Sequence, residues 1–165
     1  MTDLSVELPA RPGPRPRTTP TNPHTQLDQQ PHDGTPRSRL RQALDRLPGV
    51  TWRPSGISVP GALALCNDGP RRGPAESFMI GGEFAHLHPA PDHSLHLMVP
   101  ASLAQQLIDL GWAEPHPVVR MGLLPPTAVM VYAPRDDGEA DLVARIVAAS
   151  HSFATDHVPG DAPPE

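Results

Sequence analysis

Hydrophobic positions divide the chain into short regular elements separated by Gly, Pro, Asp and Asn. From about residue 37 to residue 47, leucine and alanine recur at three- and four-residue spacing, and Pro48 and Gly49 follow. This spacing predicts an amphipathic helix that ends before the proline. The same periodicity predicts two further helices, over 102–111 and 137–154.

Short apolar runs bounded by turn residues predict strands. The run at 127–133 is apolar on both faces, which is typical of a strand inside a sheet. Helices and strands together predict one two-layer α+β domain, with about three helices on one face of a mixed, mostly antiparallel sheet of about five to six strands. The predicted strands are 50–54, 61–67, 77–81, 83–88, 94–99 and 127–133.

The two ends of the chain differ in composition from its middle. Eight of the 24 prolines lie within residues 1–36, a segment with few apolar side chains. Such a segment buries too little surface to offset the entropy of ordering, so we predict a disordered tail in which His24 and His32 are polar filler. The folded domain is predicted over 37–156, and a second tail over 157–165.

Four of the nine histidines lie in the segment GGEFAHLHPAPDHSLHL, residues 81–97. The residues on both sides of its Pro-rich loop alternate between apolar and polar, which predicts a β-hairpin. With the loop centred on its middle proline, His86 is opposite His96 and His88 is opposite Ser94. Opposed side chains on one face have Cβ atoms about 5 Å apart, so the three histidines are expected to converge.

Three convergent imidazoles can bind one transition-metal ion. We therefore predict His86, His88 and His96 as metal ligands, with zinc as the first candidate ion and iron or copper next. No nucleotide cofactor is expected, because the chain has no G-x-G-x-x-G motif. Two alternatives stay open at this point: metal-free acid–base chemistry by the histidines, and a purely structural role.

Acidic residues near the histidines are candidates for supporting roles. Alternation along the strand places Phe84 on the face of the histidines and Glu83 on the opposite face, so Glu83 is expected to be an outer or structural residue. Asp92 in the hairpin loop is expected to orient an imidazole N–H. Glu114 is predicted as a general base on metal-bound water or on the substrate, or as an additional ligand. His116 is predicted as a fourth ligand or a flanking catalytic group.

Two further residues are candidates for contacts with a substrate. Trp112 follows the end of a predicted helix and is expected either to anchor the core or to form a pocket wall. Arg135 follows the strand at 127–133, and it is predicted to bind an anionic group of the substrate or to pair with Asp136 or Asp137.

Composition excludes several classes of protein. All 13 basic residues are arginine, which excludes a Schiff-base lysine and a P-loop lysine. A net charge of −5 argues against nucleic acid or an anionic membrane as a partner. One cysteine, Cys66, and the lack of a long apolar run predict a cytoplasmic protein.

The motifs GEFAHLHPAPDHSLHL, GWAEPHP and VMVYAPRDD together resemble those of small proteins described as luciferase domain-containing, over roughly residues 37–153. The resemblance implies that His86, His88, His96, Glu114 and His116 form one set. His93 departs from the pattern, in which that position is more often glycine. The resemblance also covers Ser94 and Tyr132, and the residues predicted to bind substrate are therefore Trp112, Ser94 and Tyr132.

Light emission does not follow from this resemblance. A flavin-dependent luciferase of the bacterial type is a TIM barrel of about 250 residues, whereas residues 37–153 number 117. We expect instead a small metal-dependent enzyme acting on a small organic molecule, by hydrolytic or lyase chemistry or by oxidation. A non-catalytic module that binds a small ligand or a metal is the alternative from a different class. The sequence leaves the oligomeric state open.

Overall fold

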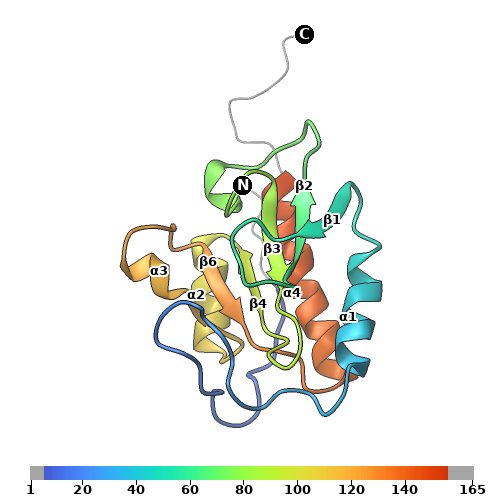
Figure 1. Ribbon diagram of the computed structural model, residues 1–165, viewed down its shortest axis with the longest axis vertical. Helices are drawn as coiled ribbons and strands as arrows, with labels where there is room; N and C mark the ends of the chain where they lie inside the picture. The colour runs from blue at the N-terminus through green and yellow to red at the C-terminus, as the bar shows by residue number, and fades with distance from the viewer. Residues whose placement is uncertain (1–5, 156–165) are drawn as a thin grey trace.

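Six strands form one sheet in the computed structural model, which describes residues 6–155 (Figure 1). Every pair of neighbouring strands is antiparallel, so the predicted α+β class is confirmed, with a wholly antiparallel sheet among the described strands. In spatial order the strands are β1 (Val50–Pro54), β2 (Leu63–Asn67), β3 (Glu83–Leu87), β4 (Leu95–Met98), β6 (Ala128–Val131) and β5 (Ala113–Pro115).

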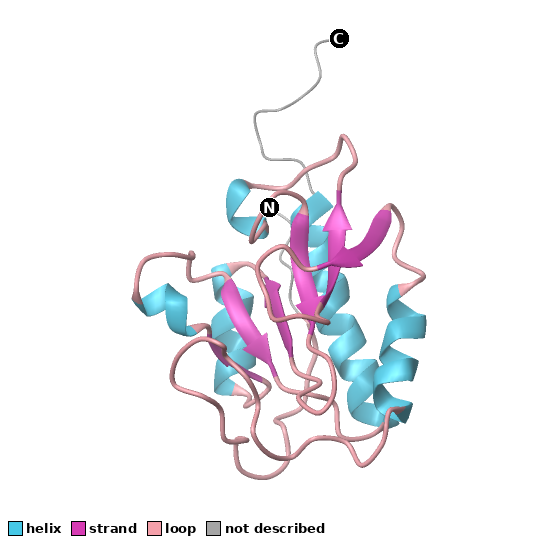
Figure 2. Ribbon diagram, in the orientation of Figure 1, coloured by secondary structure: helices cyan, strands magenta, loops and turns pink. Residues whose placement is uncertain are grey.

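Three helices cover one face of this sheet. Helices α2 (Ala101–Asp109) and α4 (Asp137–Thr155) lie behind the sheet in the view of Figure 2, and α1 (Thr35–Leu44) packs beside α4. These are the three helices that the hydrophobic periodicity predicts. The structure adds α3 (Pro117–Arg120) and the 3-10 turn η1 (Ala75–Ser77), which are too short to produce a periodic pattern.

The core lies between the sheet and these helices. Alternate residues of β3, β4 and β6 point toward the helices and are almost fully buried, including Leu87, Leu97 and Val129. Val143 and Ile146 of α4 face them at helical spacing. The other face of the sheet is thereby free for polar side chains, and it carries the histidines.

The segment 77–81 is not a strand, contrary to the prediction. Ser77 is the last residue of the 3-10 turn η1, and of the residues that follow it in this segment only Ile80 forms a bridge, with Glu83. A tight turn causes this: the Glu83 N–H donates to the Ile80 carbonyl at 2.9 Å, and Gly81 adopts a φ of 53°. Glycine tolerates that left-handed conformation. The chain therefore reverses before 77–81 can pair with a neighbouring strand.

A β-bulge in β3 reverses the predicted faces of Glu83 and Phe84. Leu65 pairs with Ala85 but the next residue, Cys66, pairs with Glu83, which leaves Phe84 as the extra residue. As a result Phe84 joins Ala85 in the core, and the Glu83 carboxylate turns toward His86. Strict alternation, which the sequence favours, cannot reveal such an insertion.

Residues 6–34 form an extended N-terminal strap that packs on the domain, which differs from the predicted disordered tail. The strap (blue in Figure 1) runs along the lower half of the molecule. The Arg11 N–H donates to the Leu110 carbonyl at 2.8 Å, and the Ala133 N–H donates to Gln26 Oε1 at 2.8 Å. Polar bonds of this kind, together with the packing of Val6 and Leu8 against the core, order a Pro-rich segment that lacks regular secondary structure. The predicted tail 157–165 lies outside the described residues.

Within residues 6–155, the structure contains no helix that combines the length and the apolar character needed to cross a membrane.

Candidate metal centre

The hairpin β3–β4 brings three histidines together on the face of the sheet opposite the helices. His86 is the direct partner of His96, and the His88 N–H donates to the Ser94 carbonyl at 2.9 Å, so the predicted register is confirmed. His86 Nε2 lies 3.0 Å from His96 Nδ1. One ring nitrogen from each of His86, His88 and His96 lies within 4.8 Å of the others, and all three side chains are buried.

In two of these imidazoles, a carboxylate binds the ring nitrogen that points away from the cluster, here called the outer nitrogen. His86 Nδ1 lies 2.8 Å from Glu83 Oε2, and His88 Nδ1 lies 2.7 Å from Asp92 Oδ2. Each carboxylate fixes the N–H on the outer nitrogen, so the inner nitrogen presents its lone pair to the cluster. This carboxylate–histidine arrangement is the one that surrounds metal ligands in proteins. Nitrogen donors oriented in this way fit a transition-metal ion.

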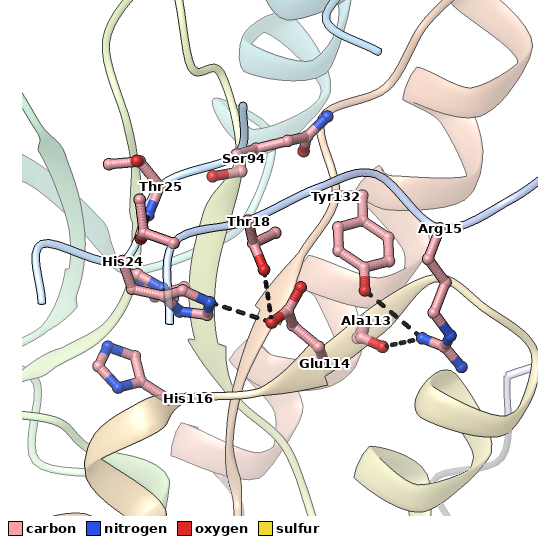
Figure 3. A network of polar contacts seen from close by, with 12 residues as sticks. Arg15, Thr18, His24, Thr25, Ser94, Ala113, Glu114, His116 and Tyr132 are labelled. Atoms are coloured by element: carbon pink, nitrogen blue, oxygen red, sulfur yellow. Dashed lines mark hydrogen bonds and ion pairs between the residues drawn. The ribbon is translucent and has the colours of Figure 1, made fainter. Parts of the chain in front are cut away.

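A fourth histidine, His24, reaches the cluster from the strap. Its Nδ1 lies 3.0 Å from His96 Nε2, and the two rings stack with centroids 5.1 Å apart. Its Nε2 lies 3.2 Å from Glu114 Oε2, which also accepts a hydrogen bond from the Thr18 hydroxyl (Figure 3). His24 is only 3% exposed, so its prediction as polar filler is wrong. The Asn22-Pro23-His24 run gives no periodic signal, and the contact spans 72 residues of sequence.

His116 completes a second group of three histidines. It is the N-cap residue of α3, where its Nδ1 accepts a hydrogen bond from the Val118 N–H at 3.2 Å. Its ring centroid lies 4.4 Å from that of His96. Ring nitrogens of His24, His96 and His116 all lie within 4.8 Å of one another, and His96 is therefore shared by both groups.

Burial lowers the pKa of His86, His96 and His116 and thereby favours the neutral form of these three imidazoles. Desolvation, followed by the proximity of the other imidazoles, holds the pKa of His96 well below its ordinary value of 6.5. The same causes lower the pKa of His116 to about 4. Burial alone would raise the pKa of Glu83, but hydrogen bonds from His86, Ser55 and Gly56 outweigh it and hold the pKa below its ordinary value. Neutral imidazole is the form that binds metal.

The histidines open into a cavity of about 540 Å³. Its polar floor consists of His24, His86, His88, His96 and His116, and part of the strap at Asn22 and Pro23 forms one side. The remaining wall is mainly apolar, and it comes from loops and from α3, which the sequence pattern did not associate with a site. Its apolar residues are Ile57, Val59, Met79, Val118, Leu123 and Leu124.

Four predicted site residues do not line the cavity. Glu114 contacts His24 and Thr18. The Ser94 hydroxyl lies 2.5 Å from Asp92 Oδ1 and 3.1 Å from His88 Nδ1. The Tyr132 hydroxyl accepts a hydrogen bond from Arg15 at 3.4 Å. Trp112 is buried in the core, and its Nε1 donates to the Pro9 carbonyl of the strap at 2.7 Å.

The structure does not bring Arg135 to the cavity. Its guanidinium pairs with Glu139, with Nη2 2.6 Å from Oε2, and Nη2 also donates to the Pro12 carbonyl at 3.1 Å. Arg135 therefore forms a local ion pair, as in the alternative prediction, but its partner is Glu139 instead of Asp136 or Asp137. The pair holds the strap against the start of α4.

Part of this histidine-bearing domain is similar to known proteins. Residues 81–150, which include both hairpin strands and His116, match the family described as Luciferase domain. A protein named luciferase from Armillaria mellea is 35% identical over 80 residues, which is 47% of this chain and 30% of that protein. A luciferase from Neonothopanus nambi is 38% identical over 80 residues, which are also 47% of this chain and 30% of that protein.

A longer match comes from a luciferase of Armillaria ostoyae, which is 28% identical over 174 positions, 93% of this chain and 64% of that protein. No solved structure matches the chain. These matches support a luciferase domain-containing family for this chain, as its motifs predicted. The chain spans less than a third of the length of the two more similar relatives.

The histidine pKa values predict how acid affects the metal-free protein. The folded pKa of His116 is about 4 and that of His96 is also depressed, so between about pH 6.5 and 4.5 the unfolded chain binds more protons. The free energy of unfolding should therefore fall as the pH drops through this window. Urea unfolding in the presence of a chelator measures it. His116→Asn, which keeps an N-cap side chain, should flatten the slope, and an unchanged slope would contradict the assignment.

Proposed function

We propose that the chain is a small metal-dependent enzyme that acts on a small organic molecule in the histidine cavity. The observation that carries this proposal is the convergence of His86, His88 and His96, with carboxylates on the outer nitrogens of the first two, at the floor of a cavity. Catalytic metal sites commonly combine three protein ligands with access for water or substrate.

The relatives support catalysis, because luciferase is the name of an enzyme. Light emission is not part of the proposal, since the chain spans less than a third of two of those proteins. A bound zinc ion would supply Lewis-acid chemistry, and iron or copper would supply redox chemistry. The chain's own residues bind the ion, position the substrate against the apolar wall and limit the access of water beneath the strap.

Each outer residue has a defined part in this proposal. Glu83 and Asp92 hold His86 and His88 in the orientation that directs their inner nitrogens to the ion. Glu114 acts through His24, whose Nε2 it contacts, and it is thus a positioning residue rather than the general base predicted from the sequence. The His116 ring stands at the cavity with its Nε2 available to a ligand or a proton.

Replacing Glu83 by Gln should weaken metal binding by about 10–100-fold, the usual effect of removing a charge that holds a metal-binding imidazole. Competition with a chromophoric chelator measures the affinity for Zn²⁺. Glu76→Gln is the matched control, because Glu76 is exposed and lies in the same part of the chain. Equal affinities of the Glu83→Gln protein and the wild type would contradict the role of Glu83.

Catalysis can be tested with two simple probes. The zinc-loaded protein is assayed on 4-nitrophenyl acetate for hydrolysis, and the copper- or iron-loaded protein is assayed for oxygen uptake with catechol. Turnover that disappears in a folded His86→Ala/His96→Ala variant supports an enzyme. Metal binding without turnover in either assay favours the alternative of a non-catalytic metal-binding module.

A specific observation favours a second candidate, metal-free acid–base chemistry. Glu83, His86, His96, His24 and Glu114 form a continuous series of contacts of 2.8, 3.0, 3.0 and 3.2 Å. Such a series can relay a proton between its ends. A protein that binds none of zinc, iron and copper would support this candidate over the metal-dependent enzyme.

The proposed partner is a small molecule, and the net charge of −5 supports neither nucleic acid nor an anionic membrane as a partner. We place the protein in the cytoplasm, since its single cysteine, Cys66, is a free buried thiol.

A further inference from the structure

His96 stands between two histidines that both present a lone pair to it. The Glu83 carboxylate accepts the N–H of His86 Nδ1, which leaves the lone pair of His86 Nε2 facing His96 Nδ1 at 3.0 Å. On the other side the Glu114 carboxylate accepts the N–H of His24 Nε2, which leaves the lone pair of His24 Nδ1 facing His96 Nε2 at 3.0 Å.

A neutral imidazole carries only one N–H and can satisfy only one of these two contacts. The other contact then brings two nitrogen lone pairs together at 3.0 Å in a buried site, which is unfavourable without a cation. A metal ion resolves the conflict on either side, because it accepts lone pairs from both nitrogens.

The two sides of His96 each possess a third nitrogen. On the Nδ1 side the third ligand is His88, whose Nδ1 contacts Asp92 and whose Nε2 is therefore the ligand atom. On the Nε2 side it is His116, whose Nδ1 accepts from the Val118 N–H and whose Nε2 is free to bind. Each side is a three-histidine group, and only His96 belongs to both.

We propose that the protein binds two metal ions and that the imidazolate of His96 bridges them. The first ion is held by His86, His88 and His96, and the second by His24, His96 and His116. Binding of the second ion releases the remaining N–H proton of His96 to solvent, so that each ring nitrogen donates one lone pair to one ion. This proposal rests on the metal site of the proposed function.

The second ion would also fasten the strap over the site. His24 is the one ligand that comes from outside the domain predicted at 37–156, and it lies 72 residues from His96 in the sequence. A strap histidine in the ligand set means that a complete site exists only when the strap is seated on the sheet.

Copper provides a direct test in the tag-free full-length chain. Two Cu²⁺ ions that share an imidazolate couple antiferromagnetically, so most of the electron paramagnetic resonance signal of the pair is lost at low temperature. We expect two copper ions per chain by elemental analysis, with a resonance signal far below that of the total copper. His24→Ala should bind one copper ion per chain and recover the full signal of an isolated ion.

His32→Ala is the matched control, because His32 is an exposed histidine of the same strap and should leave both readouts unchanged. Circular dichroism verifies that each variant is folded. One ion per chain in both the wild type and His24→Ala would overturn the second site and leave the proposed function intact. Two ions with a full, uncoupled signal would overturn the bridge, and a chain that binds no metal would overturn the proposed function as well.

Discussion

Replacement of His96 by Ala should reduce the affinity for metal more than any other single change, by well over roughly 100-fold. Loss of a carboxylate that only orients a ligand costs at most about 100-fold. His96 belongs to both three-histidine groups, so its loss removes a ligand from each. Isothermal titration of the metal-free variant with Zn²⁺ measures the effect.

The control for this prediction is His151→Ala. His151 is also buried, but it lies on α4 and its Nε2 contacts the Pro48 carbonyl at 2.9 Å, outside both histidine groups. The control should bind Zn²⁺ as the wild type does. Equal affinities of the His96→Ala and His151→Ala proteins would show that His96 is not a metal ligand.

Replacement of Trp112 by Ala should lower the free energy of unfolding by about 3–5 kcal/mol, the usual cost of deleting a buried Trp side chain. Trp112 is 2% exposed and packs in the core, and it also holds the strap through Pro9. Urea unfolding followed by circular dichroism measures the change. A loss below about 1 kcal/mol would contradict the role of Trp112 as a core residue.

Trp112→Phe separates the effect of core packing from the effect of the hydrogen bond between Trp112 and Pro9 of the strap. It retains most of the apolar volume but loses the Nε1 hydrogen bond, which is worth about 0.5–1.5 kcal/mol. Trypsin reports the strap directly: it does not cut Arg11-Pro12 or Arg15-Pro16, whereas Arg17 is exposed and precedes Thr18. Faster cleavage after Arg17 in the Phe variant is expected, and equal rates would show that the bond to Pro9 does not hold the strap.

Local patterns in the sequence predict the hairpin because its determinants are themselves local. Alternation and loop length place His86 opposite His96, and the structure has that pairing. Asp92 likewise lies four residues from His88, within one turn of the hairpin. Helices α1, α2 and α4 follow for the same reason, since each is long enough to repeat its apolar stripe.

Features that depend on distant contacts could not be predicted. His24 joins the cluster through a Pro-rich strap that contacts residues about 100 positions away, for example through the hydrogen bond between Gln26 and Ala133. The bulge at Phe84 turns Glu83 toward His86 through pairing with a neighbouring strand. Neither leaves a periodic signal, and the apolar cavity wall comes from loops and the short helix α3, whose packing is equally non-local.

Elemental analysis shows whether the histidine cluster binds metal. Tag-free protein is purified, dialysed against metal-free buffer and measured by inductively coupled plasma mass spectrometry beside the His86→Ala/His96→Ala variant. We expect at least one zinc, iron or copper ion per wild-type chain and none in the folded variant. A wild-type protein that is metal-free and takes up none of these ions when they are added would contradict metal binding by the cluster.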